Sequence, residues 1–436
     1  MTAAGAEAIA VALAGTGAEV RPAEPSDVVG GVLPSCVASP ATVDQAAGVM
    51  AAAAGLDLAV VPRGSGDTIS WGWPPARCDV VADLSGMDQV LEYAAGDLVV
   101  KVQAGVRLGQ LAEILAEKGQ RLALDGPPGV TVGGAVARNA AGPLRLRYGL
   151  PRDLLIGITI VRPDGALAHA GGKVVKNVAG YDLGKLFAGS QGTLGLIVET
   201  TFRLHPLPDL SAYVIEEYRE SAAAAEAVLA AAASPLQPSA VELERARVGG
   251  PIRVATLLEG TPSGVSARAE RMRTLLGRSA ETMMAAPDWW GRTGEASPSG
   301  MTTVVAGGTL VRVAFWAAEL RPVLDAIDTV AGEAGVAVSV GGSAGAGVLY
   351  ALLAAGQDPG QVAVFVRALR AATGHAAGPD GGGLARGSVV VLTAPAAVLE
   401  AADPWGPVPS LGLMRAVKQQ FDPGHLMSPG RGPGGI

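Results

Sequence analysis

Residues 173–195 read KVVKNVAGYDLGKLFAGSQGTLG. The first half of this stretch is polar and contains Lys176, Asn177, Tyr181 and Asp182, and the second half is a glycine-rich turn. Three glycines stand within the seven residues 189–195, a density that soluble proteins seldom use unless another backbone or a planar ligand comes very close. Two more glycine clusters precede this stretch. Three such clusters in one domain indicate a single large ligand.

The first upstream cluster is VPRGSGDT at 61–68, which follows a short apolar run that predicts a buried strand. Its two glycines can present successive backbone N–H groups to one anion, and Ser65 and Thr68 add hydroxyl donors. The next glycine is Gly72, so the GxGxxG spacing of a dinucleotide-binding Rossmann turn is missing. An ordinary tight turn is the alternative. Because the carboxylate of Asp67 would repel a diphosphate, we expect it to point away and to accept hydrogen bonds from backbone amides.

The second cluster, DGPPGVTVGGAVA at 125–137, predicts the start of a helix. Thr131 is a suitable N-cap for a helix that begins near Val132, and the glycines allow the helix end to approach a ligand. Small residues then share one helix face, at Gly134, Ala137 and Ala141. Close packing of a helix on a strand explains the same residues equally well, so this motif alone leaves both interpretations open.

The order of these motifs along the chain resembles the FAD-binding domain of the vanillyl-alcohol oxidase / p-cresol methylhydroxylase (PCMH) superfamily. More narrowly, residues 173–195 and GPLRLRYGLPRDLLIG at 142–157 are similar to the FAD-binding subunit of glycolate oxidase. FDPGHLMSPGR at 421–431 is similar to the closing segment of that family, and residues 288–290 and 311–316 resemble its second half. The resemblance runs from Val28 to Arg431 and is specific as far as the glycine-rich turn.

This resemblance implies a set of FAD-binding residues. The diphosphate would be wrapped by the backbone of the first cluster, at Arg63, Gly64, Ser65, Gly66, Asp67 and Thr68. The second cluster would meet the diphosphate and the ribityl side of the flavin, at Pro128, Thr131, Val132, Gly133 and Gly134, with Ala137 and Asn139 beside it. The adenosine or the flavin edge would lie along Gly192, Thr193 and Ile197.

The polar half of the opening stretch supplies the candidate catalytic residues, Lys176 and Tyr181. Lys176 can hold a substrate carboxylate or a reduced, anionic flavin, and Tyr181 can cover a ring system or donate a hydrogen bond. A surface lysine and a buried tyrosine are the alternatives for these two positions. Asn177 and Asp182 are expected to brace the loop.

The chain departs from the family in its histidines and in one glutamate. Family members with covalent flavin commonly attach it to a histidine in the first loop, but no histidine occurs between Met1 and Ala168, so non-covalent FAD is expected. Hydroxy-acid dehydrogenase relatives bind a divalent metal through an HxHxGDG segment. None of the four histidines of this chain stands at that spacing, so no metal site is expected. Gln191 replaces the usual glutamate of the glycine-rich turn.

Composition limits the other functions. A formal net charge of −7 argues against a nucleic-acid surface, although Arg145, Arg147 and Arg152 form either a solvated basic loop or an anion-attracting rim. No run of roughly 18 apolar residues predicts a membrane span. Cys36 and Cys78 are too few for a disulfide framework or an iron–sulfur cluster. No basic segment precedes the first apolar residues, so we expect no secretory signal and a cytoplasmic location.

Hydrophobic patterns and the resemblance together predict an α+β fold in four parts. Residues 1–25 are an N-terminal extension, and 26–208 form a PCMH-type FAD-binding domain of two subdomains. Residues 209–404 form a substrate-type or interaction domain with an antiparallel sheet covered by helices, and 405–436 return to the FAD domain. Helices are predicted at 41–54, 107–118, 222–233, 265–276, 318–334 and 359–372. Strands are predicted at 58–62, 80–84, 98–102, 154–162, 194–205, 241–243, 252–258, 309–316, 336–340 and 388–393.

Three functions fit these residues. The first is an FAD-binding oxidoreductase subunit like that of glycolate oxidase, which oxidises a small 2-hydroxy acid of the glycolate or D-lactate type. The chain lacks a metal site and an evident general base. The implied partners are therefore a second flavin subunit that holds the metal site and an iron–sulfur subunit that takes the electrons. The second is a self-sufficient flavin oxidase or dehydrogenase acting on an alcohol or lactone. The third is a flavin-binding assembly subunit without turnover of its own.

Overall fold

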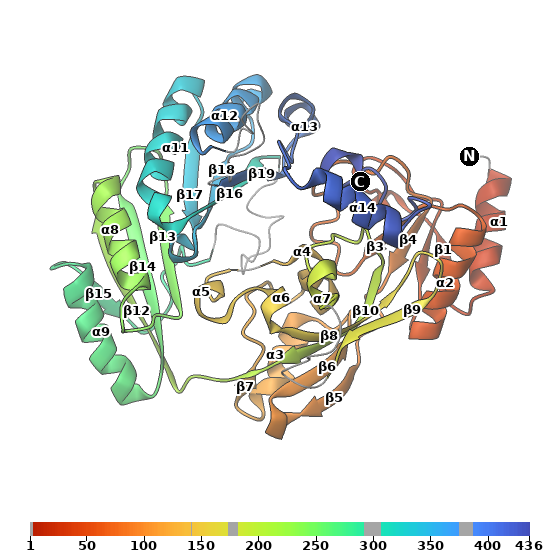
Figure 1. Ribbon diagram of the computed structural model, residues 1–436, viewed down its shortest axis with the longest axis horizontal. Coiled ribbons are helices and arrows are strands. Elements are labelled where there is room, and N and C mark those ends of the chain that lie inside the picture. Colours follow the sequence, from red (N-terminus) through yellow and green to blue (C-terminus); the bar gives the residue numbers. More distant parts are fainter. Residues whose placement is uncertain (1–2, 141, 173–181, 292–306, 375–386) are drawn as a thin grey trace. The chain divides into compact units, whose positions relative to one another are not determined.

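The computed structural model describes residues 3–140, 142–172, 182–291, 307–374 and 387–436. The chain divides into two compact units (Figure 1). Unit 1 comprises Met1–Ala140, Leu150–Pro206 and Ser410–Ile436, and unit 2 comprises Ala141–Gly149 and Leu207–Pro409. The functional domain limits expected after residues 25, 208 and 404 stay a prediction.

The N-terminal half of unit 1 is a four-stranded sheet in the order β1-β2-β4-β3. The last three strands run parallel, and β1 pairs antiparallel with β2. The strands are β1 (Glu19–Pro22), β2 (Cys36–Ser39), β3 (Val60–Arg63) and β4 (Val80–Asp83), and the helices are α1 (Ala3–Ala14) and α2 (Val43–Gly55). Leu13, Val49 and Met50 join the helices and the sheet in one core. Val20 of β1 also packs against this core.

The second half of unit 1 is a five-stranded antiparallel sheet in the order β5-β6-β10-β8-β9. Its strands are β5 (Val90–Ala94), β6 (Val99–Gln103), β8 (Leu155–Val161), β9 (Leu167–Gly171) and β10 (Leu196–Arg203). The helices here are α3 (Leu108–Ala116), α4 (Val132–Arg138), α6 (Pro151–Leu154) and α7 (Gly184–Phe187), and β7 (Gln120–Arg121) pairs with β11 (His205–Pro206). The predicted amphipathic helix at 107–118 is confirmed as α3, which buries Leu111 and Leu115.

The C-terminal segment belongs to unit 1. Helix α14 (Leu411–Phe421) carries Lys418, whose side chain is 1% exposed and whose ammonium lies 2.6 Å from the carboxylate of Asp422. The ammonium also donates to the carbonyl oxygens of Thr193 (2.7 Å) and Met427 (2.8 Å). Desolvation lowers the pKa of Lys418, although the Asp422 carboxylate opposes this shift. Beyond α14, Met427 lies in a parallel bridge with Val60 of β3.

Unit 2 is an eight-stranded sheet in the order β15-β12-β14-β13-β17-β18-β16-β19, antiparallel throughout. The strands are β12 (Leu210–Tyr218), β13 (Ala240–Arg245), β14 (Ile252–Gly260), β15 (Glu281–Met283), β16 (Thr309–Phe315), β17 (Val338–Gly342), β18 (Val348–Leu353) and β19 (Gly387–Thr393). Figure 1 shows the four long helices on one face of the sheet: α8 (Ser221–Ala232), α9 (Pro262–Leu276), α11 (Leu320–Ala334) and α12 (Pro359–Ala372). The predicted antiparallel sheet covered by helices is confirmed. The described residues of unit 2 also include the short helices α5 (Arg145–Tyr148) and α13 (Ala396–Ala402).

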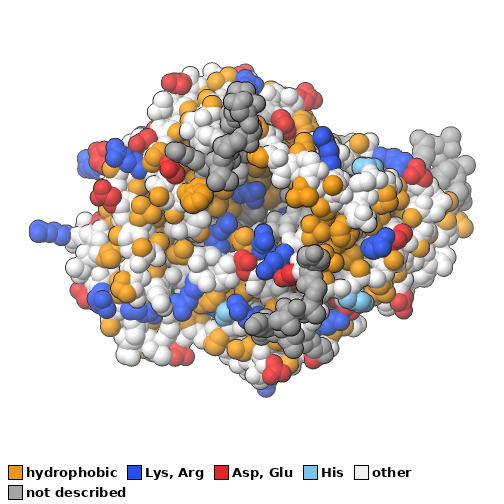
Figure 2. All heavy atoms as spheres, in the orientation of Figure 1, with side chains coloured by type: hydrophobic (Ala, Val, Ile, Leu, Met, Phe, Trp, Pro, Cys, Tyr) orange, Lys and Arg blue, Asp and Glu red, His pale blue; other side chains and the backbone are white. Residues whose placement is uncertain are grey.

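The surface carries no sign of a charged face devoted to one kind of partner in the view of Figure 2, where acidic, basic and hydrophobic side chains are interspersed. Within the residues that the structure describes, no helix has the length and apolar character needed to cross a bilayer.

Candidate functional site

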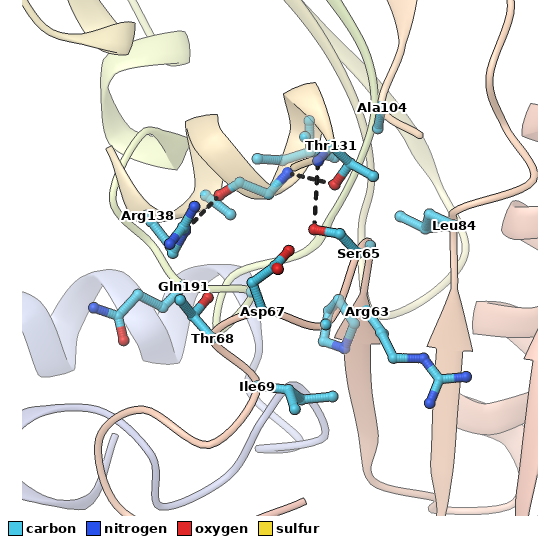
Figure 3. A pocket seen from close by; sticks show the side chains of 18 of the residues that line it. Arg63, Ser65, Asp67, Thr68, Ile69, Leu84, Ala104, Thr131, Arg138 and Gln191 are labelled. Carbon is cyan, nitrogen blue, oxygen red and sulfur yellow. Dashed lines mark hydrogen bonds between the residues drawn. The ribbon is translucent and has the colours of Figure 1, made fainter. Parts of the chain in front are cut away.

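A pocket in unit 1 is walled by the glycine-rich segments that the sequence singles out (Figure 3). It has about 910 Å³ of empty volume, part of which opens to solvent. Gly64 from the first cluster, Gly134 from the second and Gly192 from the third all line it. The three clusters are far apart in the sequence, so this convergence is produced by the fold.

The loop after β3 is anchored from behind by Arg63. Its guanidinium lies 2.7 Å from a carboxylate oxygen of Asp27 and 2.8 Å from one of Asp83. Figure 3 shows this side chain directed away from Ser65 and Asp67. A hydrogen bond from Arg21 holds the pKa of the buried Asp27 well below its usual range. Arg63 therefore stabilises the loop through its side chain and offers a ligand only its backbone.

The loop at 64–68 presents a row of unengaged backbone amides. Among the described residues, none accepts a hydrogen bond from the N–H groups of these five positions, and the first closing bond runs from the amide of Ile69 to the carbonyl of Gly66 (3.1 Å). Gly66 has a φ of +81°, which side chains other than glycine rarely adopt. Successive free amides in such a turn form a concave anion site.

Helix α4 packs closely on the first loop but offers a ligand no free amides from its first turn. The Thr131 hydroxyl accepts from the Gly134 amide (3.3 Å), which confirms the predicted N-cap. The amides of Val132 and Gly133 donate to the carbonyls of Val106 and Ala104, both at 2.8 Å. A Cβ added to Gly64 would collide with the Thr131 hydroxyl. The first turn of α4 is thus already satisfied, and it packs directly on the first loop.

The glycine-rich turn is fitted between α4 and β3. Gly192 has a φ of +72°, and a Cβ there would lie 2.9 Å from a ring carbon of Pro62. The amide of Gln191 donates to the carbonyl of Ala137 (2.8 Å), and that of Gly189 donates to the carbonyl of Val136 (3.0 Å). The missing side chain of Gly192 therefore serves two purposes. It lets the turn pack closely on Pro62, and it places the turn in the wall of the pocket.

The structure brings most of the sequence-predicted residues to the pocket: Arg63, Gly64, Ser65, Gly66, Asp67, Thr68, Thr131, Gly133, Gly134, Ala137, Gly192 and Ile197. Four others lie outside its lining. Val132 is in the hydrophobic core, and Pro128 packs on Gly109. The Asn139 side chain accepts from the amide of Arg152 (3.1 Å), and the Thr193 hydroxyl donates to the carbonyl of Ser190 (2.7 Å).

The candidate catalytic residues Lys176 and Tyr181 lie outside the described residues, as does Asn177. The expectation for Asp67 is wrong. Its carboxylate points into the pocket in Figure 3, and its buried Oδ2 has no hydrogen-bond partner within the described part of the chain. No described backbone amide donates to it.

Several lining residues escape sequence reasoning. Arg138 of α4 lies over the ring of Trp71, with 5.5 Å between the guanidinium carbon and the ring centroid. Arg431 reaches the pocket from the C-terminal segment. The FDPGHLMSPGR motif was the available signal for Arg431, but the motif does not say which of its side chains faces a ligand. Among the described residues, no cluster of His, Cys, Asp and Glu could hold a metal ion.

Comparison with known proteins identifies an FAD-binding domain in this chain. Residues 34–171 match the family described as FAD binding domain. An uncharacterised FAD-linked oxidoreductase of Mycobacterium tuberculosis is 29% identical over 428 residues, which cover 91% of this chain and 90% of that protein. The Bacillus subtilis glycolate oxidase subunit GlcD is 33% identical over 213 residues, or 48% of this chain and 45% of that protein.

Solved structures share the fold at low sequence identity. p-Cresol methylhydroxylase with substrate bound has a TM-score of 0.68 at 16% identity, covering 92% of this chain and 88% of that one. Xylooligosaccharide oxidase from Myceliophthora thermophila has a TM-score of 0.66 at 18% identity, covering 96% and 97%. The chain is therefore an FAD-linked oxidoreductase with an FAD-binding domain at residues 34–171, and it shares the fold of p-cresol methylhydroxylase.

Proposed function

We propose that this chain binds FAD non-covalently in the pocket of unit 1 and acts as the flavin subunit of a glycolate-oxidase-like complex. The observation that carries the proposal is the meeting of three glycine segments around five unengaged amides. Those donors match the anionic oxygens of a dinucleotide diphosphate. The lack of a histidine before His169 supports non-covalent attachment, since no histidine belongs to the first loop.

The residues present fit the cofactor in chemistry as well as in shape. The amides at 64–68 would hold the diphosphate, and the small faces of Gly134 and Ala137 would allow the dinucleotide to pass close to α4. Leu84 and Ile197 offer apolar contact to a ring system. Asp67 is the one feature that opposes a diphosphate, because its charge is negative. When bound, FAD supplies a two-electron acceptor for the hydride of a carbon that bears a hydroxyl group.

The proposed substrate is a small 2-hydroxy acid of the glycolate or D-lactate type. Support comes from relatives that carry the names glycolate oxidase subunit, D-lactate dehydrogenase (Arabidopsis thaliana, 32% identity) and D-2-hydroxyglutarate dehydrogenase (Stutzerimonas stutzeri, 33% identity). The matches cover only 48%, 48% and 42% of this chain and 45%, 37% and 40% of those proteins. Since the HxHxGDG segment is missing, a second flavin subunit would supply the metal site, and an iron–sulfur subunit would accept the electrons.

The test begins with the purified chain after reconstitution with FAD. Yellow absorbance that is released intact by acid precipitation is expected for non-covalent binding, and a colourless protein would refute the proposal. Anaerobic mixing with glycolate and with D-lactate then locates the chemistry. Bleaching by either acid with no other subunit present would identify a self-sufficient enzyme. Bleaching that requires added partner subunits would support the complex, and no bleaching with partners would indicate an assembly role.

A further inference from the structure

Arg431 is a pocket-lining cation whose place in the site depends on the fold rather than on a local motif. It stands in the C-terminal segment, yet one of its terminal nitrogens donates to the carbonyl oxygens of Ile69 (2.5 Å) and Trp71 (2.8 Å). These contacts bring the guanidinium to the far end of the first loop. Its Nε is buried and has no hydrogen-bond partner in the part of the chain that the structure describes.

The charge of Arg431 is also without a counter-ion. Among the described residues, no carboxylate lies within ion-pair distance of its guanidinium, and the buried thiol of Cys78 is the one titratable neighbour that acts on its pKa. Burial lowers the pKa of Arg431 to about 10, so the group is still charged at neutral pH. A buried charge with no partner is costly and is retained where a ligand supplies the opposite charge.

Other buried cations of the chain show what a purely structural role looks like. Arg63 is paired with Asp27 and Asp83, and Arg245 is paired with Asp328. Arg370 has no carboxylate at hydrogen-bond distance, but its Nε, Nη1 and Nη2 donate to four carbonyl oxygens. Arg431 differs from all three. Among the described residues its Nε has no acceptor and its guanidinium has no carboxylate partner, although it lines the pocket.

We propose that Arg431 is a positioning residue that pairs with an anionic phosphate oxygen of the bound dinucleotide, so that the C-terminal segment completes the cofactor site. The inference rests on the proposed function of the pocket. With one terminal nitrogen held by the carbonyls of Ile69 and Trp71, Nε is the donor left for a phosphate oxygen, and the charge of the guanidinium strengthens that bond. The same side chain would thereby tie the first loop, the C-terminus and the ligand together.

The test compares the full-length protein with R431Q and R431K, and with R415Q as a matched control. Arg415 is an exposed arginine of α14 that donates to the carbonyl of Gly434 and lies outside the pocket lining. FAD affinity is measured by flavin fluorescence at two salt concentrations, with riboflavin as a phosphate-free probe. We expect R431Q to bind FAD at least about tenfold more weakly, or ~1.4 kcal/mol, with a smaller salt dependence and unchanged riboflavin affinity. R431K should keep the salt dependence and recover part of the affinity.

Thermal melts separate this role from a structural one. Without FAD, R431Q loses the bonds to Ile69 and Trp71 but also an unpaired charge, so its Tm should stay close to that of the wild type, whereas the FAD-induced rise in Tm should shrink. Equal losses of FAD and riboflavin affinity, or an undiminished FAD-induced rise in Tm, would overturn the inference. Inorganic pyrophosphate distinguishes the two proposals. If the wild type binds no FAD but gains Tm with pyrophosphate through Arg431, the proposed function fails and the phosphate contact stands.

Discussion

At the scale of single residues, Asp67 is the side chain least suited to a diphosphate site. Its buried Oδ2 has no partner among the described residues, and it shares the pocket wall with the free amides at 64–68. We expect D67N to bind FAD several-fold more tightly, because the substitution removes a like charge beside the phosphates. The measurement is an FAD titration of the variant against D97N, which removes the same charge from an exposed position outside the pocket. Weaker binding by D67N would instead assign the carboxylate to a hydroxyl or N–H donor of the ligand.

Asp27 shows how a charge far from the ligand shapes the loop. It is 2% exposed and accepts from Arg21, Arg63 and the amide of Glu24. Because its pKa in the folded protein is held well below the ordinary 3.8, the carboxylate stabilises the fold above about pH 4, and this contribution is lost as the pH falls further. D27N should therefore lower the free energy of unfolding by about 3 kcal/mol at pH 7, the usual cost of breaking a buried pair.

Urea unfolding of D27N and the wild type at pH 7, 5 and 3.5 checks this expectation, and the difference should narrow at the lowest pH. D57N is the control, since Asp57 is mostly exposed and its contact with Arg77 is 3.2 Å. An exposed pair of this kind contributes less than about 1 kcal/mol. A difference for D27N that does not change with pH would mean that packing, not charge, explains its effect.

At the scale of elements, the glycine-rich turn should tolerate no side chain where it meets β3. G192A places a Cβ 2.9 Å from Pro62 and forces a left-handed φ of +72°, which alone costs roughly 1–2 kcal/mol for a non-glycine residue. We expect a Tm several degrees below the wild type and weaker FAD binding, because the displaced turn also carries the pocket wall. G86A is the matched control, since nothing lies within 4 Å of a Cβ at that position. Equal melting of both variants would show that the turn relaxes freely.

Elements with clear periodicity or caps could be predicted from the sequence. The helix predicted at 359–372 has the same ends in α12, and the predicted N-cap at Thr131 forms its bond to Gly134. Strands β12 and β18 were not predicted. β18 is a central strand with both faces covered, so its apolar run VLYALL has no alternation to recognise. β12 begins two residues after Pro208, next to the domain limit expected after residue 208.

The residues of the candidate site also fall into two groups, those that the sequence could predict and those that it could not. Local motifs predicted the loops that line the pocket, because glycine turns and a capped helix depend on neighbours in the sequence. Arg138, Trp71 and Arg431 could not be assigned, since their roles depend on contacts between distant segments. The direction of Asp67 was mistaken for a related reason. The sequence pattern does not say which amides of a glycine loop a neighbouring carboxylate can reach, and in the fold none of them donates to Asp67.

At the scale of the whole molecule, the chain leaves unit 1 and returns to it. Residues 207–409 of unit 2 are inserted before the C-terminal segment, and 141–149 also belong to unit 2. An isolated fragment of residues 26–208 would therefore lack α1, Lys418 and Arg431. We expect such a fragment to fold poorly and to bind no FAD, whereas the full chain does both. Circular dichroism and FAD titration of the fragment check this expectation, and a folded, yellow fragment would show that the C-terminal segment is dispensable.

The buried pair of Lys418 and Asp422 is the link that holds the returning segment. Lys418 joins α14 to the carbonyl of Thr193, while the Asp422 carboxylate accepts from the amides of Leu426 and Met427 at 3.0 and 2.8 Å. K418M leaves a buried carboxylate without its cation, and we expect a loss of about 3–5 kcal/mol in the free energy of unfolding. R321M, which breaks the exposed pair of Arg321 and Asp325, is the control with an expected loss below about 1 kcal/mol.

Amide hydrogen exchange would show which elements lose stability in K418M. The Lys418 ammonium contacts Asp422, Thr193 and Met427, all of unit 1. In K418M the strands β3 and β10 and helix α4 should therefore exchange faster, while the sheet of unit 2 keeps its protection. Lys418 donates to the carbonyl of Thr193, which belongs to the glycine-rich turn. We therefore expect FAD affinity to fall together with the exchange protection of unit 1. Equal acceleration in both units would mean that they unfold as one cooperative body, and the C-terminal segment would then stabilise the protein as a whole rather than the cofactor site it returns to.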